Sequence, residues 1–115
     1  HRDIVIKGDG SPLRSYMYAG DLVLWLLRML SNGEPGSVFN VGSDHAISIL
    51  DLAKAVMRIS EESLEIKIMQ SPPAPGPPSR YVPAIGKAVS ELDLTLVTPL
   101  ETAIDATINY YRNNS

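Results

Sequence analysis

The spacing of apolar residues divides the chain into short strands and longer helices. Residues 4–6 are all β-branched and predict a strand, and residues 8–12 (Gly-Asp-Gly-Ser-Pro) combine several turn-forming residues. Residues 15–18 favour a strand again. An almost wholly apolar stretch over residues 21–30 follows and predicts a helix that begins at an acidic residue, Asp21. The first third of the chain is therefore predicted as strand, turn, strand and helix.

The predicted helix over residues 21–30 has almost no polar face. We expect it to end near Gly33, a glycine suited to the left-handed position after a helix. A helix that is apolar all round must be covered on every side. Helices beginning near Ser48 and Thr98 are expected to cover two sides, so the pattern indicates a missing domain or a partner subunit for the rest.

The middle of the chain predicts a strand, a helix and a second strand. Residues 37–42 form a short apolar run that favours a buried strand. Ser48 is suited to cap a helix, with Asp51 three residues later, and apolar residues recur at helical spacing as far as Met57. Residues 64–68 alternate between apolar and charged, as in a half-buried strand.

The last third begins with residues 71–78, which contain five prolines and one glycine. This composition excludes a ladder or a helix, and the stretch is predicted as a linker or as a loop that crosses a ligand cleft. A short helix is expected over residues 84–92. The final helix has Thr98 as the expected N-cap, Pro99 in its first turn and Glu101 completing a capping box.

Composition restricts the possible functions. A chain of 115 residues predicts one domain, residues 1–115, that would bury about two-thirds of its unfolded surface if it closed a core alone. The formal charge of −3 gives no basic face for nucleic acid or an anionic membrane, and cysteine is absent. His1 and His45 are too far apart in sequence to suggest a zinc site. The apolar run at residues 22–30 is shorter than a membrane span, so we expect a cytoplasmic protein.

Arg14 is the strongest chemical candidate in the sequence. It follows the predicted turn at residues 8–12, and a guanidinium held there could bind a diphosphate through two parallel hydrogen bonds. An arginine beside a turn is more often a surface or structural residue. The residue type alone therefore leaves both interpretations open.

Residues 8–22 also carry a resemblance. Their pattern Gly-Asp-Gly-Ser-x-x-Arg-Ser-Tyr-x-Tyr-x-x-Asp-Leu resembles the motif that opens the C-terminal part of the NAD-dependent nucleotide-sugar epimerases and dehydratases, in the extended short-chain dehydrogenase/reductase family. Residues 38–43, 49–53, 81–92 and 100–112 resemble later family segments in the same order. The resemblance covers nearly all of this chain and the C-terminal third of a typical member.

This resemblance implies an α/β fold with about four helices and three to four short strands, like the C-terminal part of an extended Rossmann-type enzyme. It implies that Arg14 contacts the pyrophosphate of a sugar nucleotide. Asn40 matches an asparagine near the nucleotide in some members, although it could equally satisfy local backbone. Arg80 is a second phosphate candidate. The family's Arg-Pro-Gly-Asp is replaced here by residues 74–77, Ala-Pro-Gly-Pro, which suggests altered substrate binding.

Two family motifs do not occur in this sequence. Cofactor binding uses a Gly-x-x-Gly-x-x-Gly turn, and the redox chemistry uses a Tyr-x-x-x-Lys pair. No tyrosine here has a lysine four residues later. The resemblance therefore implies NAD for the intact enzyme, whereas this chain is expected to bind no cofactor and to lack catalytic residues, which leaves its own enzyme status undecided.

Two functions follow as expectations. The first is the substrate-binding fragment of an epimerase or dehydratase, without its Rossmann cofactor domain, that binds a nucleoside diphosphate sugar weakly. The alternative is a stand-alone protein that keeps the scaffold for oligomerisation or partner binding. Both give the apolar helix a partner, either the missing Rossmann domain or an identical subunit in a homo-oligomer.

Overall fold

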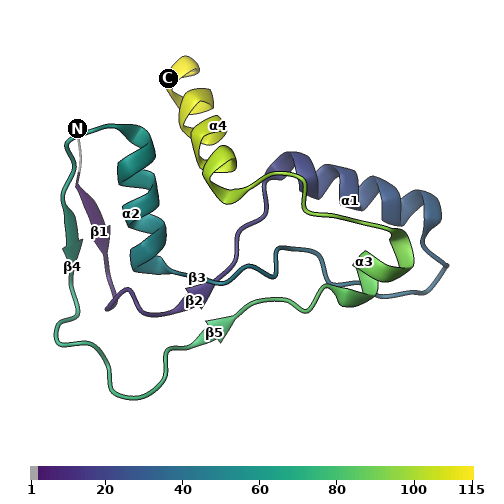
Figure 1. The fold of residues 1–115 in the computed structure, drawn as a ribbon, viewed down its shortest axis with the longest axis horizontal. Helices are drawn as coiled ribbons and strands as arrows, with labels where there is room; N and C mark the ends of the chain where they lie inside the picture. Colours follow the sequence, from purple (N-terminus) through teal and green to yellow (C-terminus); the bar gives the residue numbers. More distant parts are fainter. Residues whose placement is uncertain (1–2) are drawn as a thin grey trace.

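The computed structural model describes residues 3–115, which form four helices and five short strands (Figure 1). In chain order they are β1 (Ile4–Ile6), β2 (Leu13–Arg14), α1 (Ala19–Asn32), β3 (Ile47–Ser48), α2 (Ile49–Ser60), β4 (Ile66–Ile68), β5 (Arg80–Tyr81), α3 (Gly86–Leu92) and α4 (Leu100–Asn113). The expected α/β class and the four helices are confirmed, with one strand more than the upper expectation.

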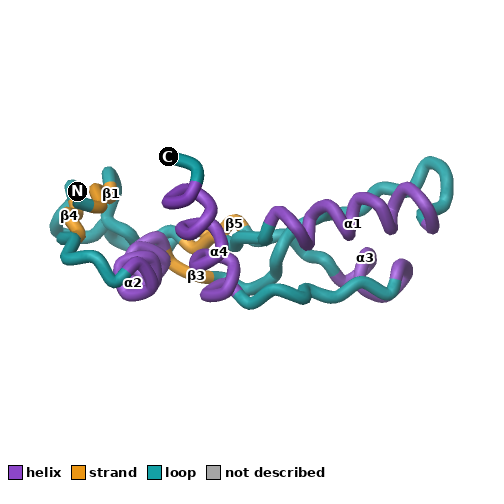
Figure 2. The backbone as a smooth tube through the Cα atoms, turned by 90° about the horizontal axis from the view of Figure 1, so that it is seen from above, coloured by secondary structure: helices purple, strands orange, loops and turns teal. Residues whose placement is uncertain are grey.

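The molecule is flat and open. It measures 47 × 41 × 18 Å, and its radius of gyration of 16.8 Å exceeds the ~13 Å typical of a closed domain of this length (Figures 1 and 2). Its accessible surface is 8117 Å², against about 6,200 Å² for a compact protein and about 18,100 Å² for the unfolded chain. About 55% of the unfolded surface is buried. This is less than the two-thirds expected if the chain closed a core alone, because it does not close around one central core.

One end of the molecule holds a parallel two-stranded sheet covered by a helix. β1 pairs with β4, placing Ile4 opposite Ile66 and Ile6 opposite Ile68. α2 connects these strands and packs against β1, while α4 packs against α2 (Figure 1). The predicted N-cap of α2 is confirmed, because the Ser48 hydroxyl oxygen accepts a 3.0 Å hydrogen bond from the Asp51 backbone N–H.

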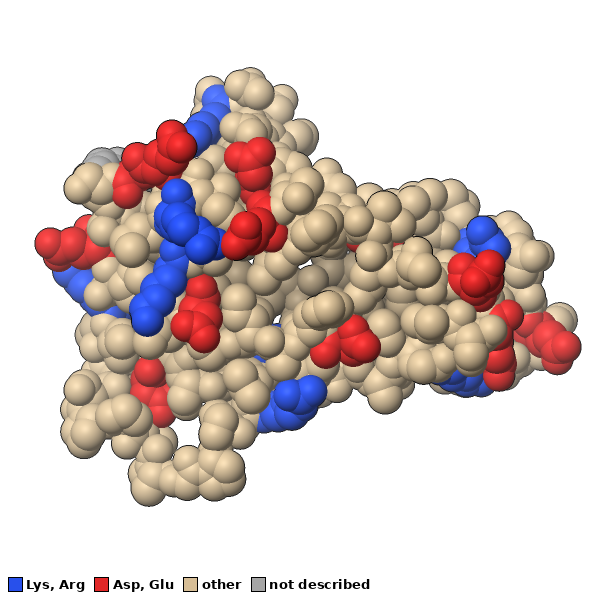
Figure 3. All heavy atoms as spheres, in the orientation of Figure 1, with Lys and Arg blue, Asp and Glu red and all other residues tan. Residues whose placement is uncertain are grey.

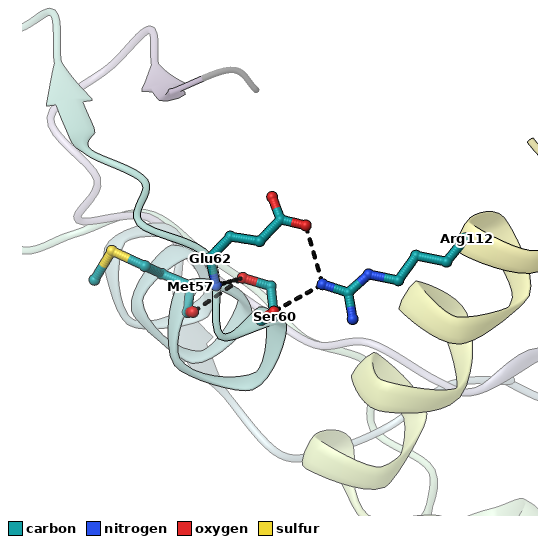
Figure 4. Close-up of polar contacts among 4 residues, drawn as sticks. All are labelled: Met57, Ser60, Glu62 and Arg112. Carbon is teal, nitrogen blue, oxygen red and sulfur yellow. Dashed lines mark hydrogen bonds and ion pairs between the residues drawn. The ribbon is translucent and has the colours of Figure 1, made fainter.

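An arginine fastens the last turn of α4 to the end of α2 (Figure 4). Nη2 of Arg112 donates to the Ser60 carbonyl oxygen at 2.7 Å and to Oε1 of Glu62 at 3.0 Å. The Ser60 hydroxyl donates to the Met57 carbonyl oxygen at 3.0 Å. These bonds satisfy carbonyls that have no partner within the helix itself. The two bonds of Arg112 connect the last turn of α4 to the end of α2.

The centre of the molecule is a three-stranded sheet with the order β3, β2, β5. β2 runs antiparallel to β3 and parallel to β5, so Arg14 lies opposite Ile47 on one side and Tyr81 on the other. The pairing of β2 with β5 joins segments that are more than 60 residues apart in sequence. It places Arg14 in the central strand.

The other end has its own small core around Trp25. This side chain is 1% exposed, and its indole N–H donates to the Thr95 carbonyl oxygen at 3.0 Å. Ile85, Ala88, Leu92 and Leu94 complete the buried cluster. α1 therefore packs against α3, and Figure 2 shows the two helices together at one end. The expectation that the helices beginning near Ser48 and Thr98 cover α1 was wrong, because those two helices pack on each other.

Most of the apolar surface of α1 faces solvent. Within the helix only Asp21 and Trp25 are buried. The exposed apolar residues are Leu22, Val23, Leu24, Leu26, Leu27 and Leu30.

The predicted left-handed conformation of Gly33 was wrong, since its φ is −70°. Gly33 is required instead by close approach, because an added Cβ would lie 2.5 Å from the Met29 carbonyl oxygen.

Three further predictions differ from the structure for identifiable reasons. Thr98 is not the N-cap of α4, because its N–H and hydroxyl donate to the two carboxylate oxygens of Asp21, at 3.0 and 2.9 Å, and Pro99 takes the cap position. Glu101 pairs with Arg58 and not with the start of its own helix.

Residues 37–42 form an extended segment and not a strand. The segment lies beside Pro83, whose nitrogen has no hydrogen to donate to a ladder.

Candidate functional site

A cleft of about 630 Å³ opens beside the central sheet. Its walls come from the end of β2, from the extended segment before β3, and from the connection between β5 and α3. The lining residues are Arg14, Ser15, Met17, Asn40, Val41, Gly42, Ser43, Tyr81, Val82, Pro83 and Ala84. The volume suits a small-molecule ligand.

Arg14 gives the cleft its charge. Of the described residues that line it, Arg14 alone is charged. Nη1 of Arg14 donates to the Leu13 carbonyl oxygen at 2.7 Å and lies 3.5 Å from the Ser79 hydroxyl oxygen. Within residues 3–115, no carboxylate forms an ion pair with this guanidinium. A half-buried cation held by neutral acceptors keeps its charge available for an anion.

Asn40 connects two walls of the cleft. Its side-chain Nδ2 donates to the Ala84 carbonyl oxygen at 3.1 Å. Nearby, Nζ of Lys87 donates to the Val38 carbonyl oxygen at 2.9 Å and lies 4.7 Å from the centre of the Phe39 ring. Asn40 therefore donates to backbone that is 44 residues away, and not to the local backbone that one of its two interpretations expected. The bond places the asparagine in the cleft and also shapes it.

Arg80 lies apart from Arg14. Successive residues of a strand point to opposite faces, and Arg14 is opposite Tyr81 whereas Arg80 is opposite Leu13. Tyr81 accordingly lines the cleft, and Arg80 is not among its lining residues. The phosphate role expected for Arg80 stays a prediction, and the geometry gives it no direct support.

Sequence reasoning missed one close contact that forms the cleft. A Cβ added to Gly42 would lie 2.9 Å from Cγ of Pro83. Glycine is needed there because the two walls approach each other so closely. Next to it, the buried Ser43 hydroxyl oxygen accepts from the His45 N–H at 3.1 Å. The sequence shows Gly42, but it does not show that Pro83, which is distant in sequence, lies beside it.

Asp9 fastens the proline-rich connection to the first turn. Oδ1 accepts from the Ser11 N–H at 2.9 Å and from the Ser11 hydroxyl at 2.7 Å, and Oδ2 accepts from the Ala74 N–H at 3.0 Å. These hydrogen bonds, led by that of the Ser11 hydroxyl, lower the pKa of the Asp9 carboxyl. Residues 71–79 join β4 to β5 and do not line the cleft. The lining of this cleft gives no support to the interpretation as a loop that crosses a ligand cleft, which stays a prediction.

Other pockets, of about 320–380 Å³, lie elsewhere on the described part of the chain. Within residues 3–115, no group of three His, Cys, Asp or Glu side chains is placed to hold a metal ion. His45 is exposed, and His1 lies outside the described residues. Acidic and basic side chains are interspersed on the face shown in Figure 3. None of the helices described has the length and apolar character needed to cross a membrane.

Comparison with known proteins identifies relatives of this chain. A model of the NAD dependent epimerase/dehydratase family matches residues 1–42. The dTDP-D-glucose 4,6-dehydratase of Mus musculus is 30% identical over 119 residues, which cover 99% of this chain and 33% of that protein. The chain is related to the NAD-dependent epimerase/dehydratase family. It spans about a third of the length of the curated relatives it matches.

Solved structures of the family share the fold. The UDP-glucose 4-epimerase of Thermotoga maritima, solved with UDP-glucose, matches with a TM-score of 0.83 and 27% identity, over 97% of this chain and 35% of that one. The dTDP-glucose 4,6-dehydratase of Bacillus anthracis, solved in complex with NAD, matches with a TM-score of 0.84 over 99% of this chain and 36% of that one. At 19% identity, the second match shows the fold alone.

Proposed function

We propose that this chain is the C-terminal, substrate-binding part of an NAD-dependent nucleotide-sugar epimerase or dehydratase. In this proposal the cleft beside Arg14 holds the diphosphate of a nucleoside diphosphate sugar. The chain supplies the substrate site and no catalytic residue of its own. A cytoplasmic location is part of the same proposal.

The observation that carries the proposal is the single cation in the cleft. A pyrophosphate is present in every nucleotide sugar, and a guanidinium binds it through two parallel, charge-assisted hydrogen bonds. Arg14 sits in the central strand of a sheet, fixed on both sides by β3 and β5. The surrounding cleft is otherwise neutral. The relative from Thermotoga maritima was solved with UDP-glucose, a ligand of this class.

The open surface supports the view that more protein completes the molecule. The chain exposes about 1,900 Å² more than a compact protein of its size. Part of this excess is the apolar surface of α1. The relatives are about three times as long as the segment that matches. We therefore propose that the remainder of a longer enzyme packs against the exposed face of α1.

The residues of this chain do not fit an NAD site. Binding of the cofactor pyrophosphate needs a glycine-rich turn between a strand and a helix. Among the described elements, β3 passes directly into α2, and the connection from β5 to α3 contains no repeated glycines. NAD then belongs to the part of the enzyme that this chain lacks, and no step of the chemistry is assigned to these residues.

The exposed face of α1 also favours a second candidate, a stand-alone protein that oligomerises or binds a partner through this helix. The two candidates differ in the genetic context. A reading frame that continues upstream into a glycine-rich turn and a Tyr-x-x-x-Lys pair supports the enzyme. A reading frame that starts at this segment supports the stand-alone protein.

Calorimetric titration with UDP-glucose and dTDP-glucose tests the substrate site. Arg14→Ala removes one charge-assisted bidentate contact. The variant is expected to bind either sugar nucleotide about ten- to hundredfold more weakly than the wild type, or by ~1.5–3 kcal/mol. Arg28→Ala is the matched control, because Arg28 is an exposed arginine of α1 outside the cleft. NAD is titrated in parallel and is expected not to bind.

Two results would contradict the proposal. The first is equal affinity of wild type and Arg14→Ala for either sugar nucleotide. The second is no binding by the wild type at millimolar ligand. Micromolar binding of NAD would show separately that the chain holds a cofactor site, and would contradict its assignment as the substrate-binding part alone.

A further inference from the structure

A second hydrogen-bonding group lies next to the guanidinium of Arg14. Ser79 is the residue immediately before β5, and its carbonyl oxygen accepts from the Leu13 backbone N–H at 2.7 Å, beside the paired strands β2 and β5 (Figure 1). Its hydroxyl oxygen lies 3.5 Å from Nη1 of Arg14. Ser79 is exposed and is not among the residues that line the cleft. A ligand held by Arg14 can therefore reach this hydroxyl from the solvent side.

The register of the central sheet explains why these two side chains meet. Residues opposite each other in a pair of strands point to the same face, so Arg14 and Tyr81 share one face. Successive residues of a strand alternate between the two faces. Ser79 precedes Tyr81 by two residues and lies on the same face as Arg14, whereas Arg80 lies on the other. The backbone thus fixes one cation and one hydroxyl side by side.

The protein itself makes little use of this pair of groups. Nη1 of Arg14 donates to the Leu13 carbonyl oxygen at 2.7 Å. Its 3.5 Å contact with the Ser79 hydroxyl oxygen is longer than the ~2.7–3.2 Å of a good N–H···O hydrogen bond. Within residues 3–115, no acceptor takes the hydrogen of the Ser79 hydroxyl. Two donors 3.5 Å apart can reach two oxygens of one phosphate group.

We propose that the Ser79 hydroxyl is a second ligand of the diphosphate, next to Arg14. This inference rests on the proposed function, because it takes the diphosphate of a nucleoside diphosphate sugar as the ligand. In the bound state a phosphate oxygen replaces the Ser79 oxygen as acceptor of Nη1, and the hydroxyl donates to the same phosphate group. A hydrogen bond to an ionised acceptor is about twice as strong as one between neutral groups. Ser79 therefore adds affinity for the diphosphate and none for the sugar or the base.

Calorimetric titration of the chain with UDP-glucose tests this contact. Ser79→Ala should weaken binding about three- to tenfold, less than the loss expected for Arg14→Ala, because Ser79 is neutral and exposed. Alanine keeps the carbonyl that accepts from Leu13, so the strand pairing is preserved. Ser79→Thr keeps the hydroxyl and should bind within about twofold of the wild type. Ser63→Ala changes an exposed serine before β4 and is the matched control, which should bind like the wild type.

Two further measurements separate a direct contact from a role in orienting Arg14. A hydroxyl that touches the diphosphate should still contribute when the guanidinium is absent. Ser79→Ala combined with Arg14→Ala should therefore bind UDP-glucose more weakly than Arg14→Ala alone, as measured by NMR titration at millimolar ligand. Uridine, which has no phosphate, should not distinguish Ser79→Ala from the wild type.

The outcomes distinguish this inference from the proposed function. Equal affinity of the wild type and Ser79→Ala for UDP-glucose, together with weaker binding by Arg14→Ala, would overturn the inference and leave the substrate site in place. An effect of Ser79→Ala that disappears in the Arg14→Ala background, or that appears equally with uridine, would also overturn it. No binding by the wild type, or undiminished binding by Arg14→Ala, would contradict the proposed function and this inference with it.

Discussion

The exposed face of α1 gives the clearest quantitative prediction for the isolated chain. Its six exposed apolar residues have exposed fractions from 38% to 83%, which add up to about 3.4 whole residues. Full burial of a large apolar side chain contributes ~1.5–3 kcal/mol. Covering the whole face is therefore worth about 5–10 kcal/mol per copy. This is comparable to the total stability of a small domain, ~5–15 kcal/mol.

A dimer recovers only part of this free energy. If pairing covers about half of the face on each of two copies, the gain is about 5–10 kcal/mol, and association itself costs at least about 4 kcal/mol. At most about 6 kcal/mol is left, which corresponds to a dissociation constant no tighter than about 40 μM. The chain should be monomeric when dilute and associate increasingly at higher concentration. A two-fold dimer is the expected geometry.

Light scattering after size exclusion, from about 10 to 500 μM, measures this association. Leu26 lies one turn from both Leu22 and Leu30, in the middle of the exposed face. Leu26→Glu should abolish association, while Met69→Glu, at a 67% exposed position beyond β4, should leave it unchanged. A wild-type chain that stays monomeric at the highest concentration and binds no hydrophobic dye would refute the reasoning.

Two further predictions concern carboxylates that fasten distant segments. Asp21→Ala leaves both donors of Thr98 without their charged acceptor and should lower the free energy of unfolding by about 2–3 kcal/mol in urea titrations. Asp51→Ala is the control, because Asp51 is an exposed acid in the first turn of α2. This variant should lower the free energy of unfolding by at most about 1 kcal/mol. Equal losses for the two variants would contradict the role of the Thr98 bonds. The pKa of Asp9 is lowered in the folded chain, so its contribution is complete above the ordinary aspartate pKa of about 3.9 and is lost as pH falls below it. Urea midpoints between about pH 5 and pH 3 should therefore fall less steeply for Asp9→Asn than for the wild type, and parallel slopes would show that the hydrogen bonds to Asp9 do not lower its pKa in solution.

Local signals in the sequence predicted the elements that depend on neighbouring residues. The β-branched run at residues 4–6 forms β1, and the hydroxyl of Ser48 caps α2 as expected. The proline-rich stretch at residues 71–78 is excluded from helix and strand, also as expected. Each of these outcomes is decided within a few residues of the chain. The resemblance added the α/β class and the candidate role of Arg14.

Contacts between distant segments could not be predicted in this way. Thr98 has the sequence signature of an N-cap, but the buried Asp21 carboxylate takes both of its donors. Residues 37–42 have the composition of a strand but lie beside Pro83, which cannot complete a ladder. The parallel pairing of β2 with β5 depends on two residues that follow the proline-rich connection of residues 71–79. The cleft is built from these distant pairings, so the sequence indicated Arg14 and Asn40 but not how the walls meet.

The central claim is that a nucleoside diphosphate sugar binds beside Arg14. Titration of the isotopically labelled chain with UDP-glucose, followed by NMR of the backbone amides, tests it most directly, with glucose as the control that lacks the diphosphate. The account predicts shifts at Arg14, at residues 40–43 and at Tyr81, Val82 and Ala84, none of them reproduced by glucose, and no shifts in the exposed half of α1. Saturable shifts confined to other surfaces, or equal shifts with glucose, would contradict it.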